Sequence, residues 1–141
     1  MTDPKPDNSN LAGRPAVLVV DDEVGVLKWL ARWLNALGYE PVLAVSPSSA
    51  LEILRCSRVD AIILDLRLDG HSGLDVLEFV RADDTLSHLP VMILTGIVPL
   101  AESELETIRR LDAYLFYKPE GIDQITAKLA ELLKRDGVPE A

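Results

Sequence analysis

Short apolar runs alternate with longer stretches of helical periodicity between residues 16 and 133. Apolar runs of about four to eight residues, bounded by polar or turn residues, are typical of buried strands. The chain contains five such runs, which predict strands at residues 16–20, 39–45, 60–64, 91–94 and 113–117.

Amphipathic stretches separate these runs and predict five helices, at residues 24–37, 47–57, 73–83, 101–111 and 122–133. Ser46 is expected to cap the second helix, with Pro47 at its first position, and Ser72 is expected to cap the third. Five strand–helix units in succession predict an α/β fold. The expected architecture is a doubly wound, five-stranded parallel sheet with helices on both faces.

The 141 residues suit a single domain, which we place at residues 15–134. Residues 1–14 are polar and rich in Pro, Asp and Asn, and predict a disordered lead-in, while residues 135–141 form a short tail. The net charge of −9 disfavours contact with nucleic acid or with an anionic membrane, because both need a basic face. Cys56 is the only cysteine, which excludes an internal disulfide and predicts a cytoplasmic protein.

Polar side chains follow four of the five predicted strands. Asp21 and Asp22 follow the first, Asp65 the third, Thr95 the fourth and Lys118 the fifth. The carboxyl ends of parallel strands meet at one edge of the sheet, so these side chains are expected in one pocket. Taken alone, the Asp21–Asp22 pair could also serve as an acidic helix N-terminus. Together the five residues suit Mg²⁺ and phosphoryl transfer to a carboxylate.

Residues 16–133 resemble the receiver domain of two-component response regulators in fold, motifs and spacing. The resemblance implies the flavodoxin-like strand order 2-1-3-4-5 and a signalling protein that is not classed as an enzyme. The motifs that carry it are Asp-Asp-Glu at 21–23, Leu-Asp-Leu-Arg-Leu at 64–68 with Gly73, Leu-Thr-Gly at 94–96, and Tyr-Lys-Pro at 117–119.

The resemblance also implies a role for each pocket residue. Asp65 would accept the phosphoryl group, and Thr95 and Lys118 would hold its oxygens. The phosphoryl donor would be a phosphohistidine on a histidine kinase or a histidine phosphotransfer protein. The receiver would act by protein–protein contact, as a monomer or a phosphorylation-dependent dimer. The Mg²⁺ ligands would be Asp21, Asp22, Asp65 and the backbone carbonyl of Arg67.

The sequence departs from the family pattern in four places. One is the absence of the usual glycine before the fifth strand, where Leu111 and Asp112 stand. Asp69 and Gly70 stand where a proline usually follows the phosphoacceptor strand, and Glu120 replaces an aromatic residue. The interval from Thr95 to Lys118 is one residue longer than in typical members. The position that normally carries a switch aromatic therefore falls on either Tyr114 or Leu115.

The first helix offers candidate partner contacts. Its apolar stripe, read from the spacing, comprises Val26, Trp29, Leu30, Trp33, Leu34 and Leu37. Trp33 is expected in the core. Trp29, at the edge of the stripe, and Leu27, off it, are candidates for exposed contact with a partner.

Two alternatives stay open at this level. The chain could be an interaction module that keeps the receiver fold without carrying phosphate. It could also be the N-terminal receiver of a longer regulator rather than a stand-alone receiver. Catalysis on an external substrate is disfavoured, since no Gly-rich phosphate loop or dinucleotide fingerprint is present.

Overall fold

The computed structural model describes residues 13–68, 70–96, 99–118 and 121–133. Most of the expected lead-in and the whole expected tail lie outside these residues, as do Asp69 and Glu120. Arg14, at the end of the expected lead-in, donates hydrogen bonds to Asn35, Gly38 and Tyr39. Arg14 therefore ties the start of the first strand to the C-terminal end of the first helix.

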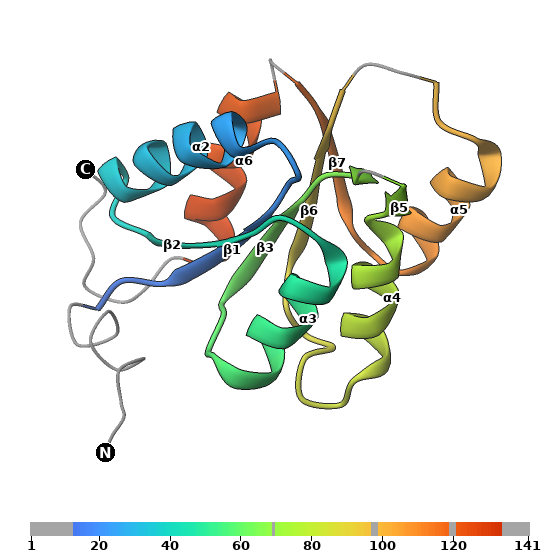
Figure 1. Cartoon of the computed structure of the whole chain (residues 1–141), viewed down its shortest axis with the longest axis horizontal. Helices are drawn as coiled ribbons and strands as arrows, with labels where there is room; N and C mark the ends of the chain where they lie inside the picture. The colour runs from blue at the N-terminus through green and yellow to red at the C-terminus, as the bar shows by residue number, and fades with distance from the viewer. Residues whose placement is uncertain (1–12, 69, 97–98, 119–120, 134–141) are drawn as a thin grey trace.

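Five parallel strands form one sheet in the order β2-β1-β3-β6-β7. This arrangement confirms the predicted doubly wound fold and the strand order 2-1-3-4-5. The sheet crosses the centre of the molecule (Figure 1). The strands are β1 (Ala16–Val20), β2 (Glu40–Ala44), β3 (Ala61–Leu64), β6 (Val91–Thr95) and β7 (Tyr114–Tyr117).

Helices cover both faces of the sheet, with α2 and α6 on one side and α3, α4 and α5 on the other (Figure 1). Their positions agree with the predicted helices to within one or two residues at each end. They are α2 (Val24–Ala36), α3 (Pro47–Cys56), α4 (Leu74–Ala82), α5 (Glu102–Arg110) and α6 (Gly121–Leu132). None of the helices among the described residues has the length and apolar character needed to cross a membrane.

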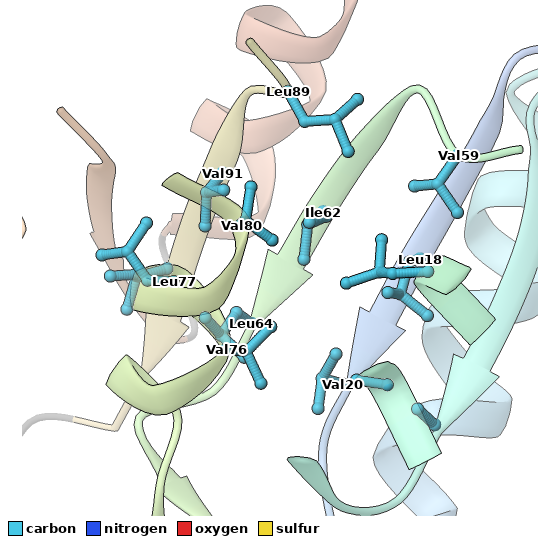
Figure 2. Close-up of a cluster of buried hydrophobic side chains, with 14 of the residues drawn as sticks. Leu18, Val20, Val59, Ile62, Leu64, Val76, Leu77, Val80, Leu89 and Val91 are labelled. Carbon is cyan, nitrogen blue, oxygen red and sulfur yellow. The ribbon is translucent and has the colours of Figure 1, made fainter. Parts of the chain in front are cut away.

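Successive strand residues point to opposite faces, so each central strand serves two cores. On β1, Leu18 and Val20 join the core beneath α3, α4 and α5, whereas Val17 and Val19 join the core beneath α2 and α6. Figure 2 shows the first of these cores, where Val76, Leu77 and Val80 of α4 lie against Ile62 and Leu64. Each fully buried aliphatic side chain contributes about 1.5–3 kcal/mol relative to exposure.

The two predicted serine caps have different outcomes. Ser46 caps α3 as expected, because its hydroxyl accepts a hydrogen bond from the amide of Ser49 at 3.1 Å. The prediction for Ser72 was wrong by one residue, since Gly73 is the N-cap of α4. The Ser72 hydroxyl instead accepts a hydrogen bond from the amide of Leu74 at 3.1 Å.

A short hairpin follows the third strand of the sheet and was not predicted. Its strands are β4 (Arg67–Leu68) and β5 (His71–Ser72), which pair in antiparallel register. Leu66 and Leu68 are buried, whereas Arg67 between them is exposed. The hairpin therefore turns the Arg67 side chain outward, beside the residue predicted to accept phosphate.

The turn between α5 and β7 is held by a single arginine. The Arg81 guanidinium donates hydrogen bonds to the carbonyls of Leu111 at 2.7 Å and Asp112 at 3.2 Å. It also donates to the carbonyls of Ser87 and Leu89 in the loop before β6. Asp112 has a φ of 59°, a left-handed conformation in which aspartate is several-fold enriched. An aspartate thus takes the backbone conformation that a glycine would favour.

Candidate functional site

Three carboxylates gather at the carboxyl end of the sheet. Asp21 and Asp22 follow β1, Asp65 follows β3, and one oxygen of each lies within 4.8 Å of the others. Asp21 is buried, with 3% of its surface exposed, and Asp22 and Asp65 are partly buried. The structure therefore brings together the acidic residues that the sequence placed in one pocket.

Backbone hydrogen bonds fix two of these carboxylates, Asp21 and Asp65, in position. The amide of Asp65 donates to the carbonyl of Val20 at 3.0 Å, and that of Asp21 donates to Ala44 at 3.1 Å, so the sheet pairing continues one residue past the strand ends. Each side chain also accepts from an amide two residues on. These bonds run from Glu23 to Asp21 at 2.9 Å and from Arg67 to Asp65 at 3.2 Å.

Lys118 supplies a positive charge to this cluster. Its Nζ lies 3.2 Å from Oδ2 of Asp21 and 3.4 Å from Oδ2 of Asp65. Burial acts to lower the pKa of Lys118, but the charges of Asp65 and Asp21 outweigh it and raise that pKa. Burial raises the pKa of Asp65, and the charge of Lys118 offsets only part of this effect. The ammonium group is therefore held in its charged form between two carboxylates.

Thr95 ends β6 at the same edge of the sheet, and a backbone hydrogen bond joins it to Lys118. The amide of Lys118 donates to the Thr95 carbonyl at 2.8 Å. The Thr95 hydroxyl is fully buried and has no hydrogen-bond partner among the described residues. A buried hydroxyl without a partner costs about 1–3 kcal/mol, so this group is poised to bind a polar atom that enters the site.

Gly73 sets how closely the start of α4 approaches the Asp65 loop. Its amide donates to the carbonyl of Leu66 at 2.8 Å. A Cβ added at Gly73 would clash with the carbonyl oxygen of Asp65 and would lie 3.2 Å from Cγ of Leu64. The glycine that stood in the family motif is therefore required by a close backbone contact.

The first helix presents a different surface from the one predicted. Leu27 was expected to be exposed, and that expectation was wrong, because only 3% of its surface is accessible. Leu27, Leu30 and Leu34 are the buried residues of α2 and face the sheet. The predicted apolar stripe included both tryptophans and was therefore rotated away from the face of α2 that is actually buried. Trp33 is only partly buried, against the α2–α6 core.

Trp29 is exposed, with 47% of its surface accessible, as expected of a partner contact. Its ring stacks on Trp33, with 5.8 Å between the ring centroids. Trp29 also lines an apolar groove of about 260 Å³ between α2 and α6, together with Val26, Ile122 and Lys118. The groove therefore reaches the lysine of the acidic pocket, and contact with a partner there stays a prediction.

The two candidates for the switch position point to opposite faces of the sheet. β7 pairs with β6 in regular register, Leu115 beside Ile93 and Tyr117 beside Thr95, so the extra residue lies outside the strand. Leu115 packs against the core that includes Ile108 of α5. The Tyr114 ring instead lies 4.8 Å from Nζ of Lys128 on α6. Leu115 is therefore the residue on the α5 side.

One feature beside the pocket was missed by the sequence analysis. The Arg67 guanidinium pairs with both carboxylate oxygens of Glu104 on α5, at 2.5 and 3.3 Å. The alternation of buried Leu66, exposed Arg67 and buried Leu68 was a signal that the Arg67 side chain faces outward. The partner of that side chain could not be read from the sequence, because Glu104 lies 37 positions further along.

Comparisons with known proteins agree with this geometry. The sequence model of the response regulator receiver domain matches residues 17–130. The chain is 35% identical over 127 residues to the probable transcriptional regulatory protein TcrX of Mycobacterium tuberculosis, covering 89% of this chain and 53% of that protein. It is 34% identical over 123 residues to the transcriptional regulatory protein PrrA of the same species, covering 87% and 52%. The chain spans about half the length of these curated relatives.

Solved structures give the same result. A response regulator receiver protein from Pseudomonas putida matches with a TM-score of 0.75 and 27% identity, over 84% of this chain and 97% of that one. The signal receiver domain of a putative Luxo repressor protein from Vibrio parahaemolyticus matches with a TM-score of 0.74 and 25% identity, over 86% and 92%. With its fold, its acidic edge and its sequence all in agreement, the chain belongs to the receiver domain family of two-component response regulators.

Proposed function

We propose that this receiver is a phosphorylation switch in which Asp65 accepts a phosphoryl group from a phosphohistidine on a histidine kinase or a phosphotransfer protein. The observation that carries the proposal is the convergence of three carboxylates, one ammonium group and one buried hydroxyl at one sheet edge, the hydroxyl having no hydrogen-bond partner in the described part of the chain. In the transfer, a carboxylate oxygen of Asp65 forms the bond to phosphorus as the bond from phosphorus to the histidine nitrogen breaks.

The donor set suits Mg²⁺. Lys118 supplies one positive charge to three carboxylates, so the pocket keeps a negative charge that a hard divalent cation would balance. A bound Mg²⁺ would neutralise charge on the phosphoryl oxygens during transfer. The residues proposed to hold the ion are Asp21, Asp22, Asp65 and the backbone carbonyl of Arg67.

The remaining pocket residues have distinct proposed roles. Lys118, already hydrogen-bonded to Asp65, would donate to a phosphoryl oxygen attached to that carboxylate. Thr95 would gain a hydrogen-bond acceptor, which its hydroxyl does not find among the described residues. The phosphoryl group would thus satisfy two donors that are already in position, which is how fixed donors favour a transferred charge.

The phosphorylated domain is proposed to signal by contact with proteins. Leu115 on the α5 side, Tyr114 on the α6 side and Trp29 at the groove are the proposed contact residues. We place the domain in the cytoplasm, with no catalysis on an external substrate. Its net charge of −9 argues against contact of this domain with DNA or membrane, although the relatives are named as transcriptional regulators.

Intact mass tests the proposal. The protein is incubated with Mg²⁺ and acetyl phosphate, and separately with a phosphorylated histidine donor. Wild type should gain one phosphoryl group, and Asp65→Asn should gain none. Asp75→Asn, the same change at an exposed position of α4, should behave as wild type. Failure of wild type with both donors would indicate an interaction module that carries no phosphate.

A further inference from the structure

The phosphoacceptor loop and α5 are joined by a charged contact, the Arg67–Glu104 bridge. The Arg67 guanidinium donates to both Glu104 oxygens, the two-pronged geometry that gives arginine–carboxylate pairs their strength. Arg67 lies two residues after Asp65, and its own amide donates to the Asp65 carboxylate at 3.2 Å. One residue thus binds the proposed phosphoacceptor with its backbone and α5 with its side chain.

The bridge is fixed at both ends. Leu66 and Leu68 are buried on either side of Arg67, so the hairpin holds the arginine pointing away from the core. Glu104 is only 18% exposed, and its Oε1 also accepts a hydrogen bond from the Ala101 amide at 2.8 Å. The same carboxylate therefore holds both the first turn of α5 and the arginine of the loop.

The helix at the far end of the bridge has few other anchors. Ile108 is the only buried residue among the nine of α5, whereas α4 of equal length buries Val76, Leu77 and Val80. Figure 1 shows α5 at the outer edge of the molecule, beyond β7 and α4. A helix with so little buried apolar surface depends more on a charged contact for its position than a well-packed helix does.

The Arg67 guanidinium is also within electrostatic reach of Asp65. Its pKa is raised first by the hydrogen bond to Glu104 and, to a smaller extent, by the charges of Glu104 and Asp65. A phosphoryl group on Asp65 would carry a charge of about −1.5 to −2 and three acceptor oxygens, in place of a carboxylate of charge −1. Phosphorylation therefore brings a stronger competing partner to the same guanidinium.

We infer that the Arg67–Glu104 bridge holds α5 in the unphosphorylated state, and that phosphorylation of Asp65 opens it by drawing Arg67 away from Glu104. This inference rests on the proposed function, because Asp65 must carry the phosphoryl group. Opening the bridge frees the first turn of α5, and so turns a charge change in the pocket into a change of the α5 surface.

Hydrogen–deuterium exchange of the α5 amides tests the inference, with and without Mg²⁺ and acetyl phosphate. Glu104→Gln removes the charge but keeps an oxygen for the Ala101 amide. Glu131→Gln neutralises an exposed ion pair on α6 and serves as the matched control. Without phosphate, α5 should exchange about two- to fivefold faster in Glu104→Gln than in wild type, the range expected from a partly exposed ion pair.

The response to phosphorylation separates a switch from a merely structural contact. Phosphorylation should speed α5 exchange in wild type and in Glu131→Gln, and should add little in Glu104→Gln, where the bridge is already open. Two outcomes would contradict the inference about the bridge and leave the proposed function intact. One is an equal response of α5 exchange in Glu104→Gln and wild type. The other is no response in wild type whose mass shows the phosphoryl group. Wild type that gains no mass would overturn both.

Discussion

At Gly73 the lack of a side chain allows a close backbone contact that no other amino acid would permit. The start of α4 passes so close to Asp65 that an added Cβ would clash with the Asp65 carbonyl oxygen and crowd Leu64. The backbone at Asp65 would have to move, because neither neighbouring atom belongs to a flexible side-chain end. A conservative substitution at this position should therefore disturb both packing and the pocket.

Gly73→Ala is predicted to lower the free energy of unfolding by about 1–3 kcal/mol, the usual cost of overpacking. Urea denaturation followed by far-UV circular dichroism measures this change. Gly25→Ala is the control, because a Cβ at Gly25 in α2 meets nothing within 4 Å. It should leave stability unchanged or raise it, since alanine favours helix over glycine. Equal effects of the two substitutions would contradict the close-contact argument.

At the scale of single elements, α2 separates a buried face from an exposed one. Leu27 is packed among the residues between α2 and the sheet, whereas nearly half of Trp29 is exposed at the groove beside α6. The larger side chain is thus the less important one for folding. A measurement that compares the two residues directly tests this arrangement against the stripe predicted from the sequence.

Leu27→Ala should lower the free energy of unfolding by about 2–5 kcal/mol, because it leaves a cavity beneath α2. Trp29→Ala should lower it by less, because nearly half of Trp29 is exposed and its stacking on Trp33 adds only about 0.5–1.5 kcal/mol beyond the area it buries. Chemical denaturation of both variants measures the difference. A larger loss for Trp29→Ala than for Leu27→Ala would show that α2 turns its tryptophans, not its leucines, toward the sheet.

Most of the elements could be predicted because strong patterns specify them. The strands β1, β3 and β6 are apolar on both faces, and polar residues end or follow every strand except β2. This pattern also predicted which side chains meet at the sheet edge. The β4–β5 hairpin escaped prediction because two-residue strands carry no usable periodicity. The Arg67–Glu104 pair escaped because contacts between distant residues depend on how the elements pack.

Other errors came from choosing between adjacent positions. Large aromatic residues shifted the expected face of α2, so Leu27 was placed on the wrong side. Counting back from Lys118 gave Leu115, with Tyr114 as the alternative if the extra residue lay within the fifth strand, and the regular register of β7 with β6 distinguishes them. Ser72 has the chemistry of a cap, but the close approach of Gly73 to Asp65 moves the start of α4 one residue further.

The whole molecule carries a net charge of −9, and its pocket concentrates part of that charge on three carboxylates. Any cation lowers such repulsion by screening, whereas a bound Mg²⁺ acts at one site. Screening depends on ionic strength alone, whereas site binding depends on the Mg²⁺ concentration and on the pocket carboxylates. The unfolding free energy of the whole protein, measured against Mg²⁺ concentration, therefore reports whether Mg²⁺ binds in the pocket.

Mg²⁺ should raise the unfolding free energy by about 2.7 kcal/mol at one hundred times its dissociation constant. Thermal melts over a range of MgCl₂ concentrations measure this increase, with NaCl at matched ionic strength to correct for screening. Asp22→Asn should lose the Mg²⁺-specific part, because it removes one of the three carboxylates. An unchanged increase in Asp22→Asn would place the bound ion elsewhere on the acidic surface.

The Arg81 contacts have a consequence for how such chains can vary in length. Arg81 fastens the turn at Leu111 and Asp112, directly before β7 begins in regular register with β6. An inserted or deleted residue ahead of that turn changes the path of the connection but not the pairing that places Lys118 beside Thr95. Segments of unequal length could therefore be exchanged between family members at this point, with the acidic pocket inherited unaltered.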